Sequence, residues 1–247
     1  MHRNPLRNIF FLILSVMFLN PAASQEQDRQ SVTESLSLYF DNIYGDDQRL
    51  VSGRIYTGPA RGSIQGHPFY SGDEWKDGII ETADGTFPVM KIKYDININR
   101  LILEYISTDN AFRQVALSPG KIVSVKMGGM DFICFPGLDD PTNTRLAEVV
   151  SKGRVSYLVI KTKALYIGNM TSSSDYEYRQ TIKQYLQYEG ELIPFRSKRT
   201  LYKLFPDKKK PLRKFIKTNY LNTAGKRTEG RKKLLDYLNA LLSADND

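Results

Sequence analysis

Between Leu50 and about Arg196, apolar and polar residues alternate in short runs that are separated by turn signals. In residues 90–96, Lys91, Lys93 and Asp95 stand between apolar residues, which is the period of a half-buried strand with its polar side in solvent. Residues 122–135 form the clearest hairpin, because Gly128-Gly129 supplies the positive φ angles that tight hairpin turns require. Further strands are expected at residues 54–57, 78–81, 101–106, 112–117, 155–167, 176–188 and 191–195.

The two ends of the chain have a helical period instead. Ser31 to Glu34 fits a capping box, which predicts a helix of about 13 residues that ends at Gly45. Near the other end, one apolar stripe surrounds Leu212 and a second runs from Leu234 to Leu242. The expected fold class is therefore α+β: an antiparallel β-rich body (open sheet, partial barrel or sandwich) with one N-terminal helix and two or three basic C-terminal helices.

The first residues have the order of a secretory signal peptide. A basic stretch precedes an apolar run from Ile9 to Leu19, and Pro21 and small residues follow. As a helix, this run of eleven residues would rise only about 17 Å, too little for a bilayer core of about 30 Å, which argues against a transmembrane anchor. We expect residues 1–24 to be a cleaved signal peptide, so that the mature chain is secreted into the periplasm or outer envelope as a soluble or peripheral protein.

After residue 24 we expect one domain. Residues 25–196 would hold the N-terminal helix and the β-rich body, and residues 197–247 would be a basic helical segment packed on it. Cys134 is the only cysteine, so packing rather than an intramolecular disulfide must stabilise the exported chain. Its apolar neighbours Ile133 and Phe135 favour a core position for the thiol over a reactive one.

The net charge of +8 is concentrated in one segment. Residues 196–233 carry fifteen Lys or Arg and two acids, a local charge of +13, so the rest of the chain sums to −5. A solvated helical face and contact with an anionic surface or polymer both fit this pattern. Nucleic acid is disfavoured as a partner, because no motif for it is present. The residues that we assign to anionic contact are Lys208, Lys209, Lys210, Arg213 and Lys214.

Few residues of the expected mature chain suit catalysis. His67 is its only histidine, and one His with one Cys does not make the usual zinc site, so we expect no metal and no cofactor. The chain has no Gly-x-Ser-x-Gly elbow and no phosphate-binding loop. Paired carboxylates of a glycosidase have no fixed spacing in sequence, so a hydrolase stays open as an alternative.

The densest polar and aromatic cluster is residues 66–75. Aromatic rings beside polar groups are typical of sugar or peptide sites, although the same segment could instead plug the end of the sheet. The candidate ligand-binding residues are His67, Tyr70, Asp73, Glu74 and Trp75.

Three stretches of the chain resemble a class of uncharacterised exported proteins of the Bacteroidota. They are the run Gly66 to Tyr70, residues 89–95 with their Lys-Tyr-Asp ending, and residues 198–210. The resemblance covers most of the mature chain and implies a cell-envelope location and a β-rich body. It brings no catalytic residue with it.

Two functions follow as hypotheses. The first is a non-catalytic envelope protein whose β-rich body binds a partner or ligand, with a basic helical end; another envelope protein or an anionic surface or polymer would be the partner. The second is a hydrolase of envelope polysaccharide or peptide, with His67 and acids in a cleft.

The leader assignment makes a direct prediction. Protein isolated from its native host should lack residues 1–24, because signal peptidase cuts after small residues such as Ser24. Intact mass spectrometry measures this, and a mature species that retains the apolar run would contradict it.

Overall fold

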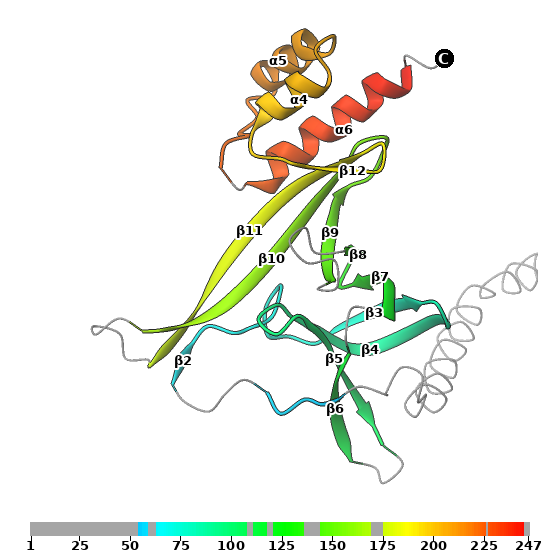
Figure 1. The fold of residues 1–247 in the computed structure, drawn as a ribbon, viewed down its shortest axis with the longest axis vertical. Coiled ribbons are helices and arrows are strands. Elements are labelled where there is room, and N and C mark those ends of the chain that lie inside the picture. Colours follow the sequence, from blue (N-terminus) through cyan, green and yellow to red (C-terminus); the bar gives the residue numbers. More distant parts are fainter. Residues whose placement is uncertain are drawn as a thin grey trace, which may run out of the picture. The chain divides into compact units, whose positions relative to one another are not determined.

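The computed structural model describes residues 54–58, 63–107, 111–117, 121–135, 144–168, 175–225 and 227–244. The expected signal peptide and N-terminal helix lie outside these residues. Strands β1 to β12 span Arg54–Ile55, Ile64–Gln65, Lys76–Thr82, Gly85–Asp95, Arg100–Ile106, Phe112–Leu117, Ile122–Met127, Met130–Phe135, Arg145–Ser151, Ser156–Ile167, Tyr176–Tyr188 and Glu191–Pro194. Helices α4, α5 and α6 span Lys198–Leu204, Lys209–Thr218 and Thr228–Ala244 (Figure 1).

The strands form one open sheet in the order β1-β6-β5-β4-β3-β7-β8-β9-β10-β11-β12. Neighbours along this path pair antiparallel, and β2 adds a short parallel pairing to β11. The expected β-rich α+β class is thus confirmed. The hairpin at Gly128-Gly129 is also confirmed, since both glycines have positive φ angles of 54° and 76°. Strand β9 was missed, because Leu146, Ala147, Val149 and Val150 do not alternate with polar residues.

The sheet curls around a core of aromatic rings. The amide of Lys163 on β10 donates to the carbonyl of Ile96, just past β4, at 3.2 Å, although four strands lie between β4 and β10 in the sheet. Between them the ring of Phe132 stands edge-on to Tyr70 with centroids 5.0 Å apart. The hydroxyl of Tyr94 donates to Asn99 at 2.8 Å and accepts from the amide of Leu146 at 3.3 Å, so these buried polar groups are satisfied.

A second core lies where the helices pack against β10, β11 and β12. Seven fully buried residues make up the centre of this core. The strands contribute Tyr157, Val159 and Leu186, and the three helices contribute Leu201, Leu212, Leu234 and Leu238. The apolar face of the alternating strands thus packs against the apolar side of the helices. In the described part of the chain, no helix is long and apolar enough to cross a membrane.

Polar contacts fix α6 to the turn between β9 and β10. The side-chain amide of Asn239 accepts from the amide of Val155 at 2.9 Å and donates to its carbonyl at 3.0 Å. Asp236 accepts a hydrogen bond from Ser151 at 2.6 Å. Gly153 lies so close to Asn239 that a Cβ there would come within 2.4 Å of its side-chain nitrogen. This turn therefore leaves no room for a larger residue at position 153.

Arg231 is the one described cation of the basic segment that is buried, with 2% of its surface exposed. It donates to four neutral oxygens: the carbonyls of Thr223, Phe195 and Arg196 at 3.2, 2.6 and 2.8 Å, and the side-chain amide of Gln184. Its guanidinium also lies 4.7 Å from the centre of the Phe195 ring. Burial lowers the pKa of Arg231, which nevertheless stays charged because a guanidinium titrates far above neutral pH. One side chain thus joins α6, β11, the chain after β12 and the loop before α6.

Replacing Arg231 with Met should lower the free energy of unfolding by at least about 3 kcal/mol. Each buried acceptor left without a donor costs about 1–3 kcal/mol, and Arg231 serves four. Urea unfolding followed by circular dichroism measures the change. Arg227→Met is the matched control, because Arg227 is exposed and its loss should change stability by less than about 0.5 kcal/mol. Equal effects of the two substitutions would contradict the role of Arg231.

Candidate functional site

The structure separates the five candidate residues of the 66–75 segment. Tyr70 points inward: it is 4% exposed, and its hydroxyl donates to Glu148 on β9. Burial and the neighbouring Glu148 carboxylate raise the pKa of Tyr70, so it stays protonated. Glu74 points outward and pairs with Lys76 at 2.9 Å. These two side chains therefore do not share a site.

Asp73 and Trp75 meet at a lysine that sequence reasoning placed on the solvent side. The ammonium of Lys93 lies 2.6 Å from Asp73, 4.4 Å from the centre of the Trp75 ring and 4.7 Å from that of Phe69. Only 10% of the Lys93 side chain is exposed. An ion pair and two cation–π contacts hold this lysine, so the rings of the segment are occupied by the protein's own cation.

His67 also makes contacts that hold the 66–75 segment in place. Its Nδ1 accepts from the amide of Phe69 at 3.1 Å, and its carbonyl accepts from the ammonium of Lys163 at 2.7 Å. Burial and the positive charge of Lys163 lower the pKa of His67, so it is neutral at physiological pH. Lys163 also donates to the carbonyl of Phe69 at 2.8 Å, and burial lowers its own pKa.

The prediction that Asp95 faces solvent was wrong. Asp95 is 2% exposed, and it accepts from the Tyr56 hydroxyl at 2.9 Å and from the amides of Asn97 and Ile98 at 2.9 and 3.1 Å. The physical reason is that its carboxylate turns back onto the amides of the following turn and lies against Tyr56, while Phe69 pairs with the same residue through a backbone bridge. Local alternation could not reveal these contacts.

Four carboxylates in and around this segment have protein partners. Asp73 and Glu74 pair with lysines, Asp95 accepts three hydrogen bonds, and Glu148 accepts from Tyr70 and lies 3.7 Å from Lys161. Within the described residues, no group of three or more His, Cys, Asp or Glu is arranged to hold a metal ion. The geometry of the segment is that of a structural plug.

The basic segment has the opposite character. Of its fourteen described Lys and Arg residues, twelve are exposed, and only Lys208 and Arg231 are not. Lys208 has 16% of its side chain exposed and lies 3.4 Å from Asp207. The exposed twelve are Arg196, Lys198, Arg199, Lys203, Lys209, Lys210, Arg213, Lys214, Lys217, Arg227, Lys232 and Lys233.

Helix α5 arranges five of these cations in one stripe, which we call the α5 stripe: Lys209, Lys210, Arg213, Lys214 and Lys217. At 3.6 residues per turn they fall within an arc of about 140°. The apolar side of the helix carries Leu212, which is buried, and Phe215 and Ile216, which pack against the same core. Arg213 lies 5.5 Å from the centre of the Tyr202 ring on α4, so the stripe adjoins that helix.

The α5 stripe works against the stability of its own helix. Lys209 and Lys210 occupy the first turn, which holds no acid, and Lys208 at the N-cap makes no capping hydrogen bond. Cations are unfavourable at this positive end of the helix dipole. Three like-charged pairs four residues apart, 209–213, 210–214 and 213–217, add repulsion of about 0.2–0.5 kcal/mol each. The stripe therefore has no evident folding role.

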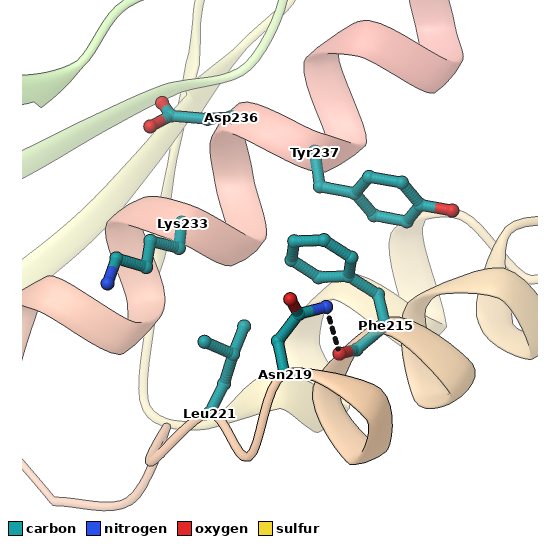
Figure 2. A pocket seen from close by; sticks show the side chains of 6 residues that line it. All are labelled: Phe215, Asn219, Leu221, Lys233, Asp236 and Tyr237. Carbon is teal, nitrogen blue, oxygen red and sulfur yellow. Dashed lines mark hydrogen bonds between the residues drawn. The ribbon is translucent and has the colours of Figure 1, made fainter.

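A pocket of about 360 Å³ opens between α5 and α6, and Figure 2 shows the six side chains that line it: Phe215, Asn219, Leu221, Lys233, Asp236 and Tyr237. The rings of Phe215 and Tyr237 stack with centroids 4.0 Å apart. Three of its polar side chains have protein partners, since Asn219 donates to the carbonyl of Phe215, Lys233 pairs with Glu229, and Asp236 accepts from Ser151 and Lys232. The pocket thus combines apolar side chains with polar ones that already have protein partners, and it lies on the side of α5 away from the stripe.

Comparison of the chain with models of known protein families, with curated proteins and with solved structures gave no match. The function therefore has to be argued from the residues and their geometry.

Reversing two charges of the α5 stripe should stabilise the protein. In Lys209→Glu/Lys210→Glu, acids would occupy the first turn of α5 and face Arg213 and Lys214 four residues on. We expect the free energy of unfolding to rise by about 1 kcal/mol. Urea unfolding tests this.

Lys217→Glu is the control, because it makes the same type of charge change in the last turn of α5, where an acid opposes the dipole. It should stabilise less for each charge reversed. Equal gains from both ends would mean that only the net charge matters.

Proposed function

We propose that this chain is an exported, non-catalytic protein of the cell envelope that binds an anionic partner through the solvent face of its C-terminal helices. The β-rich body is the scaffold on which these helices pack. The leader-like first 24 residues support export, and the resemblance to envelope proteins of the Bacteroidota supports the location.

The observation that carries this proposal is the α5 stripe. Its five cations are exposed, helix α5 holds no acid, and their placement lowers the stability of the helix that carries them. Residues that break a local stability rule without a compensating contact are expected at functional sites. A surface with this much positive charge attracts anionic partners, and this is the function that we assign to it.

The contacts of the 66–75 segment favour binding over hydrolysis. A general base must reach its substrate, and a glycosidase needs two carboxyl groups about 5–10 Å apart that face a substrate. Here Asp73, Glu74, Asp95 and Glu148 all have protein partners, and His67 accepts from a backbone amide.

Binding to two anionic probes tests the proposal. The mature chain should bind phosphatidylglycerol-containing vesicles or alginate at low salt, and it should ignore phosphatidylcholine vesicles and dextran. Lys209→Glu/Lys210→Glu/Lys214→Glu should weaken binding at least about tenfold, since one basic residue adds about 1 kcal/mol and tenfold is about 1.4 kcal/mol. Co-sedimentation and biolayer interferometry measure the affinities.

The control is Lys121→Glu/Lys126→Glu/Lys152→Glu, which makes the same change in net charge at exposed lysines on strands of the sheet or next to them. It should bind almost as well as the wild type. The proposal fails if neither anionic probe is bound at low salt, or if both triple variants lose the same affinity.

A further inference from the structure

We infer that the anionic partner is a linear acidic polysaccharide, which lies along the α5 stripe and contacts Tyr220 at its end. This inference rests on the proposed function and names the chemical class of the partner. Three features of α5 carry it: the shape of the stripe, the burial of the opposite side of the helix, and the conformation of Tyr220.

The α5 stripe is narrow and straight. From Lys209 to Lys217 it rises about 12 Å along one helix, at 1.5 Å per residue. Arg213, in its middle, is packed beside the Tyr202 ring, which holds its guanidinium in place. A row of cations along one helix is complementary to a row of anions on one flexible chain, since each repeat of the polymer then meets one or two cations. Because the contacts act together, affinity depends on the length of the polymer.

The other side of α5 is not free to enter a membrane. Amphipathic helices that bind lipid bury their apolar side in the bilayer. In this protein Leu212 is fully buried, and Phe215 and Ile216 pack against the core formed with β10 to β12. Helix α5 can therefore offer a lipid surface only its cations, with no apolar anchor, and this favours a polymer over a bilayer.

Tyr220 places an aromatic ring just beyond the last cation of the stripe. Its side chain is 93% exposed, although its φ angle is +49°. The amide of Leu221 donates to the carbonyl of Ile216 at 3.0 Å and that of Tyr220 to Lys217 at 3.4 Å, which is a Schellman ending with tyrosine where glycine is usual. The ring thus stays in solvent at a strained position, where it can stack on an apolar sugar face.

Titration of the mature chain with alginate, monomeric galacturonate and phosphatidylglycerol vesicles tests the inference. Alginate should bind more tightly than the vesicles at equal anion concentration, and galacturonate should not compete. The logarithm of Kd should rise linearly with the logarithm of salt concentration, as for other linear polyanions. Lys209→Glu/Lys210→Glu/Lys214→Glu should weaken alginate binding at least about tenfold and flatten this slope.

Tyr220→Gly separates recognition from stability. Glycine suits the left-handed conformation, so the thermal midpoint should rise, while alginate affinity should fall about fivefold through loss of stacking. An unchanged affinity would overturn the role of Tyr220. Binding to vesicles without binding to alginate would overturn the inference and leave the proposed function standing, whereas binding to neither would overturn both.

Discussion

The guanidinium of Arg231 joins α6 to β11, to the chain after β12 and to the loop before α6. It is buried without a carboxylate, and its charge is balanced by the carbonyls of Thr223, Phe195 and Arg196 and the amide of Gln184. A buried charge is costly unless its hydrogen bonds are complete, so this contact tolerates few alternative arrangements. The leucines of α4 to α6 supply the bulk of the packing, but apolar contacts have little directionality. Arg231 supplies directional contacts to β11 and its neighbours, and Asn239 and Asp236 supply further ones to the turn between β9 and β10, so that α6 is held on the sheet at both places.

The two polar regions of the protein use their charges in opposite ways. Around the 66–75 segment, Lys93 and Lys163 are covered and each has several partners, so they hold the segment on the curled sheet. On α5 the cations are exposed and repel one another, at a cost to the helix. The same residue type is structural in one region and available to a partner in the other. Burial and partners, not composition, distinguish the two.

The sequence was sufficient for most strands and for the C-terminal helices, because alternation and helical spacing are local properties. It was sufficient for the Gly128-Gly129 turn, whose backbone requires residues that tolerate positive φ. It was not sufficient for Asp95 and Lys93, which lie at polar positions of β4 but contact residues far earlier in the chain: Tyr56 hydrogen-bonds to Asp95, and Asp73 and Trp75 contact Lys93. Arg231 was counted with the surface cations for the same reason: only the packing of α6 on β11 reveals that it is buried. The conformation of Tyr220 likewise could not be predicted from the sequence, because the residue at this position of a Schellman motif is usually glycine.

Lysine footprinting tests the central claim, that the exposed face of α5 meets the anionic partner, most directly. The protein would be acetylated briefly with and without alginate, and the acetylation of each lysine would be measured by mass spectrometry. The polymer should protect Lys209, Lys210, Lys214 and Lys217, and it should leave Lys126 and Lys152, which are also exposed, as reactive as before. Equal protection of all exposed lysines, or protection confined to the sheet, would contradict this claim.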